Sequence, residues 1–119
     1  MNNSKYNIEI KLKVQVGTKS QFGPGKVFLM EAIQETGSIS AAAKKIGMSY
    51  RKAWKLVNDL NLISKNKMVY TSIGGKGHGG TKLTSTGKAF IDLYRRMEKK
   101  ILVTVKNEKY KLEKIISNL

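Results

Sequence analysis

Residues 38–61 constrain the fold more than any other segment, because two short helical patterns meet there across a single glycine. Two helices that cross steeply need small residues where they touch, and the three alanines at positions 41–43 supply them. Gly47 tolerates the positive φ that a tight turn between the helices requires. Ser38 and Ser49 each stand where a helix N-cap is expected. The pattern therefore predicts a helix-turn-helix over residues 38–61.

The second helix of this motif, expected from Ser49 to about Asn61, has two sides of different character. Four residues at helical spacing predict a buried side: Tyr50, Ala53, Val57 and Leu60. The opposite side gathers cationic and amide side chains: Arg51, Lys52, Lys55 and Asn58. A helix that enters the major groove of DNA presents such donors near its N-terminal end. This side predicts a recognition helix, and a helical hairpin with a solvated basic face is the alternative.

Side-chain chemistry suggests a role for each of these residues. Arg51 can pair with guanine and Asn58 with adenine, whereas the two lysines between them can reach phosphates. Ser38 and Ser40, at the start of the preceding helix, can offer hydroxyl and backbone N–H groups to a phosphate. The candidate DNA-binding residues of the motif are Ser38, Ser40, Ser49, Tyr50, Arg51, Lys52, Lys55 and Asn58.

A glycine-rich run follows the helix-turn-helix and separates two short strand patterns, at residues 68–73 and 81–84. Glycines at a hairpin tip let the backbone lie close to a sugar–phosphate chain, and basic side chains beside them add attraction. The sequence therefore predicts a wing, a β-hairpin over residues 68–84, with a plain flexible turn as the alternative. The candidate DNA-binding residues of the wing are Lys76, His78 and Lys82.

Catalytic and metal-binding chemistry find no support in the residue types. The glycine run has the spacing of a P-loop, but Thr81 and Lys82 follow it in the reverse of the required order. His78 is the only histidine, cysteine is absent, and the eight carboxylates stand singly along the chain. We therefore predict no catalytic residue, no metal site, no cofactor and no enzymatic activity.

Apolar residues alternate with polar ones at the N-terminus and predict a strand over residues 6–16 with one buried face. Because a lone strand cannot satisfy its backbone groups, it must pair within the fold or with another copy. Residues 17–25 are expected as a loop in which Pro24 suits a first helical turn. The first of three helices within residues 24–61 then follows. Its expected apolar side is Val27, Leu29, Met30 and Ile33.

Residues 86–119 contain no proline, and their apolar residues recur at helical spacing, which predicts one long helix or two in tandem. The stripe is longer than a three-helix core needs. We expect its first turns to pack on their own domain and the rest to pack against a second copy. Folding back onto the first helix is the alternative. The candidate dimerisation residues are Tyr94, Met97, Ile101, Val105 and Leu112.

The net charge of +15 results from 23 Lys and Arg against 8 Asp and Glu, and it favours a polyanionic partner. A lysine-rich surface kept for solubility, or binding to RNA or a membrane surface, is compatible with the charge alone. No apolar run approaches the ~20 residues that span a membrane, so membrane insertion is not expected. The N-terminus lacks the apolar stretch of a signal peptide, which predicts a cytoplasmic protein.

The segment GSISAAAKKIGMSYRKAW at residues 37–54, followed by GGKGHGGTKLTSTG in the wing, resembles the N-terminal DNA-binding domain of the ModE family of molybdate-responsive regulators. It is more distantly similar to LysR-type DNA-binding domains. The resemblance covers nearly the whole chain. It implies an opening strand, a winged helix-turn-helix, a wing that ends in a leucine-threonine-x-x-glycine signature (residues 83–87 here) and a long helix. It also implies a homodimer that binds operator DNA.

Members of that family continue into C-terminal domains that bind molybdate, whereas this chain ends at Leu119. We therefore expect these residues not to bind molybdate directly, and we predict no small-molecule effector. The start at Met1 and the end at Leu119 favour a natural full chain, with an excised domain as the alternative.

Together these features predict a single domain over residues 1–119 of the α+β, mainly α class. It is a winged helix-turn-helix with an N-terminal strand and a long C-terminal dimerisation helix. The leading function is a sequence-specific transcription regulator that binds an inverted-repeat operator in double-stranded DNA as a homodimer. A non-specific architectural nucleic-acid-binding protein is the alternative. A protein-interaction module that has lost DNA binding is a third possibility, against which the basic side of residues 51–55 argues.

Overall fold

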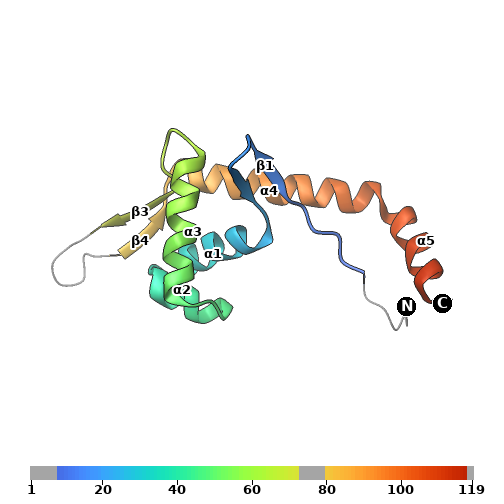
Figure 1. Ribbon diagram of the computed structural model, residues 1–119, viewed down its shortest axis with the longest axis horizontal. Coiled ribbons are helices and arrows are strands. Elements are labelled where there is room, and N and C mark those ends of the chain that lie inside the picture. Colours follow the sequence, from blue (N-terminus) through green and yellow to red (C-terminus); the bar gives the residue numbers. More distant parts are fainter. Residues whose placement is uncertain (1–7, 73–79, 118–119) are drawn as a thin grey trace.

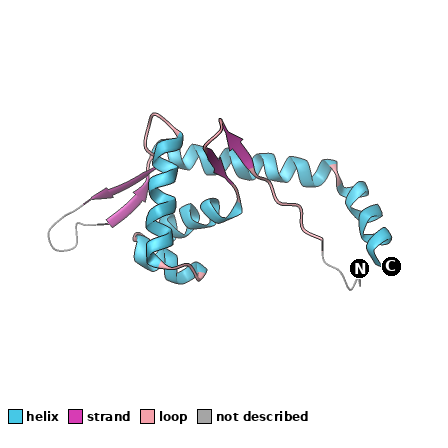
Figure 2. Ribbon diagram, viewed as in Figure 1, coloured by secondary structure: helices cyan, strands magenta, loops and turns pink. Residues whose placement is uncertain are grey.

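The computed structural model describes residues 8–72 and 80–117, in which helices dominate and the strands form two antiparallel pairs (Figure 2). This arrangement confirms the predicted α+β, mainly α class. In chain order the elements are β1 (Val14–Val16), β2 (Ser20–Phe22), α1 (Pro24–Thr36), α2 (Ile39–Ile46), α3 (Tyr50–Ile63), β3 (Val69–Ser72), β4 (Gly80–Leu83), α4 (Ser85–Thr104) and α5 (Lys106–Ser117).

The N-terminal strand is much shorter than predicted for residues 6–16, of which the first two lie outside the described residues. Only its last three residues form β1, which pairs with β2 in a segment expected to be loop. The described residues before β1 are extended but belong to no strand. The Leu12 carbonyl instead accepts a hydrogen bond from the Tyr94 hydroxyl at 2.7 Å. The strand prediction is wrong in this part, because a helix side chain rather than a second strand satisfies the backbone there.

The core forms where α1, α2 and α3 meet. Helix α1 begins at Pro24, the residue suited to a first turn and two residues inside the expected loop, and it buries its whole expected apolar side: Val27, Leu29, Met30 and Ile33. Ala42 and Ala43 of α2 are buried, whereas Ala41 is exposed. Ala53 of α3 is completely buried, so small side chains lie where the helices approach one another.

The C-terminal stripe forms two helices in tandem, α4 and α5, which is one of the two predicted forms. The break is at Val105, whose φ of −99° and ψ of 14° leave helical geometry. Just before it, the Thr104 hydroxyl donates a hydrogen bond to the Lys100 carbonyl at 2.8 Å. A hydroxyl that bonds back to the carbonyl four residues earlier often bends a helix, and α5 turns away from α4 just beyond this bond (Figure 1).

The described chain is elongated, with principal extents of 60 × 29 × 22 Å. The β3–β4 hairpin projects at one end, and α4 runs from the base of that hairpin toward the other end, where α5 turns away from it (Figure 1). Helix α3 lies across the body between the hairpin and the β1–β2 ribbon (Figure 1). This arrangement leaves one side of α3 free of other elements.

Candidate nucleic-acid interface

Both serines predicted as N-caps close the start of their helices. Ser38 accepts a hydrogen bond from a first-turn N–H of α2 at 2.9 Å, and Ser49 does the same for α3 at 3.1 Å. Between the two helices Gly47 adopts a φ of +71°, the left-handed conformation that the turn was predicted to need. The following N–H, of Met48, donates to the Ala43 carbonyl at 2.8 Å. These local bonds set the angle between α2 and α3.

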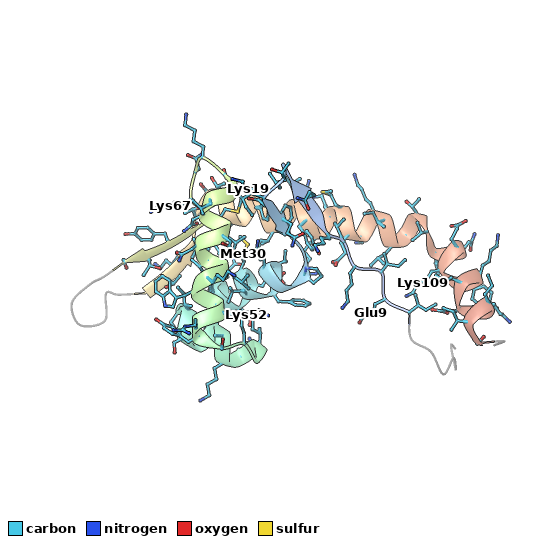
Figure 3. All side chains as sticks on the ribbon, in the orientation of Figure 1. Glu9, Lys19, Met30, Lys52, Lys67 and Lys109 are labelled. Carbon is cyan, nitrogen blue, oxygen red and sulfur yellow. The ribbon has the colours of Figure 1, made fainter. Side chains whose placement is uncertain are left out.

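Helix α3 has the two-sided character that its sequence predicts. Its inner side is buried in the core: Ala53, Val57 and Leu60. Its outer side is exposed: Arg51, Lys52, Lys55 and Asn58. The rise of 1.5 Å per residue places the first and last of these about 10 Å apart along the helix, close to the ~12 Å width of a major groove. Figure 3 labels Lys52 beside the N-terminal half of α3.

Tyr50 does not belong to the buried side, and that part of the prediction is wrong. Its side chain is 54% exposed, and its ring meets Trp54 edge-on with centroids 6.1 Å apart. As the first residue of α3, Tyr50 precedes the turn at which the helix meets the core, so its ring extends past the core. It therefore lies next to Arg51 at the exposed start of the helix, where a DNA contact requires it to be.

The three serine candidates lie close to this start. Ser40 and Ser49 are exposed, and Ser38 is half-buried. A hydroxyl that accepts a main-chain N–H still has its own proton to donate. Each capping serine can therefore hold its helix and donate to a phosphate oxygen at once.

The wing candidates divide between described and undescribed residues. Lys82 is exposed on β4, opposite Tyr70 of β3. Lys76 and His78 lie outside the described residues. The strands β3 and β4 fall within the hairpin predicted over residues 68–84 and pair from Val69↔Leu83 to Ser72↔Gly80.

Asn61 connects α3 to the wing, a role that the sequence did not reveal. Its side-chain oxygen accepts hydrogen bonds from the N–H groups of Met68 and Val69 at 2.9 and 3.0 Å. Its amide nitrogen donates to the Val69 carbonyl at 3.0 Å. On β4, the Thr81 N–H donates to the carbonyl of Gly37 at 2.8 Å. The wing is therefore bonded on one side to α3 and on the other to the turn between α1 and α2.

The leucine-threonine-x-x-glycine signature joins β4 to α4. Thr84 caps α4 by accepting the Gly87 N–H at 3.0 Å, and its hydroxyl donates to the Lys67 carbonyl at 2.6 Å. A Cβ atom on Gly87 would lie 2.2 Å from the Met68 carbonyl oxygen. The signature requires glycine here because backbone passes directly over backbone. It thereby fixes the start of α4 against the base of the wing.

Tyr94 lies in the core of the domain, with 1% of its surface exposed. Burial, followed by the nearby charge of Glu98, raises its pKa. The sequence placed Tyr94 in a dimer contact, and the structure assigns it instead to anchoring the N-terminal segment. The other four candidates are half-buried or exposed: Met97, Ile101, Val105 and Leu112.

Ion pairs hold two carboxylates of α1, Glu31 and Glu35. Arg95 bonds Glu31 of α1 through two nitrogens, at 2.5 and 3.1 Å, and Glu98 through a third at 2.8 Å. The hydrogen bonds to Glu31 raise the pKa of Arg95. Glu35 of α1 pairs with Lys45 of α2. These pairs attach α4 and α2 to α1 on surfaces away from the outer side of α3.

Two other kinds of site, a metal centre and a membrane span, find no support among the described residues. Among residues 8–72 and 80–117, His, Cys, Asp and Glu side chains form no group of three or more that is able to hold a metal ion. Within the same residues, each helix is too short or too polar to cross a membrane. What the described site offers is an exposed basic helix beside a hairpin, a surface matched to a polyanion with grooves.

A tight-turned helix pair, a second helix with an exposed basic side, and a hairpin bonded to that helix define a winged helix-turn-helix domain. No family model matches the chain. Among solved structures, the CbnR_DBD–DNA complex matches with a TM-score of 0.58 at 22% identity, over 74% of this chain and 95% of that one. VV2_1132, a LysR family transcriptional regulator, matches with a TM-score of 0.51 at 17% identity, over 70% and 27% of the two chains.

Curated relatives give the more specific likeness. The chain is 36% identical over 112 residues to the transcriptional regulator ModE of Yersinia pestis, and the match covers 92% of this chain and 43% of that protein. It is 40% identical over 86 residues to the DNA-binding transcriptional dual regulator ModE of Escherichia coli K12, and that match covers 72% of this chain and 33% of that protein. The chain thus spans less than half the length of these relatives. It is a winged helix-turn-helix domain of the ModE type, and it shares its fold with the two solved structures.

Proposed function

We propose that the chain is a sequence-specific transcription regulator that binds an inverted-repeat operator in double-stranded DNA. The outer side of α3 carries this proposal, because Arg51, Lys55 and Asn58 are all exposed on it while the opposite side is fixed in the core. Arg51 is suited to bidentate contact with guanine and Asn58 to adenine, whereas lysines are suited to phosphates. The names of the ModE relatives, as transcriptional and DNA-binding regulators, support the same function.

Selection of bound sequences from random duplexes tests this proposal. The wild-type protein is expected to enrich one inverted repeat with half-sites about one helical turn, or a multiple, apart. Arg51→Ala is expected to remove about 1–3 kcal/mol of discrimination at one base pair of each half-site. Arg96→Ala, which removes an exposed arginine on α4, is the matched control and should leave the preferred sequence unchanged. A wild-type pool without any enriched sequence would refute the proposal.

A homodimer is the form in which this chain would read an inverted repeat. Beyond the core, α4 and α5 expose large apolar side chains, among them Met97 at 45% and Leu112 at 46%. A helix that projects past its own domain is stabilised when such a stripe is buried against a second copy. Met97, Ile101, Val105 and Leu112 are therefore the proposed dimer contacts, without Tyr94.

Sedimentation equilibrium tests the dimer directly. The wild type is expected to behave as a dimer at micromolar concentration and Met97→Glu as a monomer, since a carboxylate would be buried without a partner. Leu62→Glu is the control, because Leu62 is an exposed leucine on α3, away from this stripe. A monomeric wild type, or a Met97→Glu variant as dimeric as the control, would contradict the proposed surface.

Non-specific coating of nucleic acid is the second candidate, favoured by the net charge of +15. Both functions predict steep salt dependence, with a log–log slope near −7 for a dimer that neutralises ~8 phosphates. They differ in sequence preference, which is typically ~10³-fold or more for a regulator. The same selection therefore separates them.

These 119 residues are also proposed not to bind molybdate themselves. The supporting observation is that the matched segments, 112 and 86 residues long, make up 43% and 33% of the two ModE relatives, whose further length has no counterpart in these residues. Calorimetric titration of the purified chain with sodium molybdate should give no saturable heat. A saturable signal would contradict this.

A further inference from the structure

A basic groove lies between the recognition helix and the N-terminal segment. Its volume is about 550 Å³, and it is open to solvent. One wall is formed by Lys52, Leu56 and Asp59 of α3. The facing wall is formed by the segment before β1 and the residues from β2 into α1, and it carries Lys11, Lys13 and Lys26.

The position of the facing wall is fixed by contacts to the core. The Tyr94 hydroxyl holds the Leu12 carbonyl at 2.7 Å, so the two lysines on either side of Leu12 are held in place along the chain. A Cβ atom on Gly23 would lie 3.4 Å from the same carbonyl oxygen, which shows how closely this segment passes over the start of α1. The side chains of Lys11 and Lys13 are exposed, and Lys26 is half-buried. The Lys11 ammonium lies 3.9 Å from the Glu9 carboxylate, an exposed ion pair that a phosphate can replace, and the Lys26 ammonium donates to the Gln21 carbonyl. The wall is therefore a backbone held to the core that carries two exposed ammonium groups, those of Lys11 and Lys13.

The floor of the groove is apolar. It includes Phe22, whose ring lies 4.1 Å from the ring of Phe90, together with Met48 at the helix-turn-helix junction. Four lysines against Asp59 give the lining a net charge of +3. A sugar–phosphate chain matches such a groove, because its deoxyriboses can lie on the apolar floor while its phosphates meet the lysines.

The groove is continuous with the proposed recognition surface, since Lys52 belongs to both. In Figure 1 the β1–β2 ribbon lies on the side of α3 from which α4 extends, opposite the wing. Lys19 is labelled on that ribbon and Lys52 on α3 in Figure 3. Of the proposed dimer contacts, Met97 and Ile101 lie further along α4, Val105 lies at its end and Leu112 lies on α5. DNA that leaves a half-site toward the centre of an inverted repeat would therefore pass this groove.

We infer that the groove binds the sugar–phosphate backbone of the operator between the two half-sites, with Lys11 and Lys13 as its phosphate contacts. The inference rests on the proposed DNA-binding function and adds a third contact region to the recognition helix and the wing. These contacts carry no base information, so they raise the affinity for every sequence and set the position of the protein on the duplex.

The test compares two charge-matched pairs of substitutions on the duplex selected by the wild type. Lys11→Gln with Lys13→Gln removes the groove contacts, and Lys99→Gln with Lys100→Gln removes two exposed lysines of α4 outside the groove. Anisotropy titrations over a salt series give, for each protein, the slope of log affinity against log salt concentration. Four lost phosphate contacts in a dimer make this slope shallower by about 3.6. Between about 50 and 150 mM salt the wild type should therefore lose about 50-fold more affinity than the groove pair. Thermal melts confirm that both pairs fold.

A positional measurement separates a local contact from a general loss of charge. Duplexes that carry one neutral methylphosphonate in place of a phosphate should bind the wild type more weakly when the change lies between the half-sites. The groove pair should lose this sensitivity, and the α4 pair should keep it. Equal slopes for the two pairs, or sensitivity retained by the groove pair, would overturn the inference while sequence selection still stood. A wild type that enriches no sequence would refute the proposed function itself.

Discussion

Replacing Asn61 by alanine would remove three hydrogen bonds at the base of the wing in one step. Its carboxamide accepts from the N–H groups of Met68 and Val69 and donates to the Val69 carbonyl. Each such bond is worth about 1 kcal/mol net, and a backbone group left without a partner costs more. The groups are only partly buried, so water would recover some of the loss. We expect Asn61→Ala to lower the free energy of unfolding by about 2 kcal/mol.

Urea unfolding followed by the fluorescence of Trp54, the only tryptophan, measures this change at one fixed protein concentration. In a thermal melt the same loss corresponds to about 8 °C. The bases preferred in a selection experiment should be the same for Asn61→Ala as for the wild type, because Asn61 bonds the wing rather than facing outward. Overall DNA affinity should fall as the wing loses its attachment to α3.

Asn58→Ala is the matched control, one turn earlier on the same helix. Asn58 is exposed, so its removal should change the free energy of unfolding by no more than about 0.5 kcal/mol. It should nevertheless relax the preference at one base pair by about 1–3 kcal/mol. The two asparagines thus predict opposite outcomes in two assays. An Asn61→Ala protein as stable as the wild type, or an Asn58→Ala protein equally destabilised, would refute the reasoning.

Substitutions at three further positions test the fold. Gly87→Ala places a Cβ atom 2.2 Å from the Met68 carbonyl oxygen, so we expect a loss of about 3 kcal/mol or more, and a melting curve like that of the wild type would contradict it. Gly47→Ala meets no atom within 4 Å but keeps a φ of +71°, so its cost in urea unfolding should be about 1 kcal/mol, and Gly47→Asn should cost less. Tyr94→Phe loses the bond to Leu12, about 1 kcal/mol at pH 7. Because burial raises the pKa of Tyr94 above 10.0, the wild type loses this advantage as the pH rises through the raised value, and the gap between the two proteins should narrow in alkaline urea titrations.

The helix-turn-helix was predictable because local rules determine it. Ser38 and Ser49 cap helices whose first turns lie within three residues of them, and Gly47 occupies the turn by its own conformational freedom. The buried side of α3 followed from helical spacing over two turns. Helical spacing also predicted Tyr50 to be buried. That prediction is wrong because spacing does not show where a helix extends beyond the core, and the side chain is exposed.

The N-terminal region and the wing attachment were not predictable, since distant residues determine them. The Tyr94 hydroxyl reaches Leu12 across 82 positions of sequence, and this bond replaces the strand pairing that the alternation suggested. Strand β2 is three residues long and exists through its pairing with β1. In the sequence Asn61 looks like any asparagine near a helix end. Its role depends on residues 68 and 69, which the fold brings back beside it.

Thr84 is the only residue between the wing and the helix that follows. Thr84 comes directly after β4 and is also the cap of α4, so the strand passes into the helix within a single residue. An insertion of one residue after Gly87 would turn everything downstream by about 100° and advance it by about 1.5 Å. A neighbouring residue would then occupy the outward-facing position that Met97 has now. Exchange of side chains along the exposed part of α4 alters contacts one at a time, whereas a change in its length redirects the whole helix surface at once.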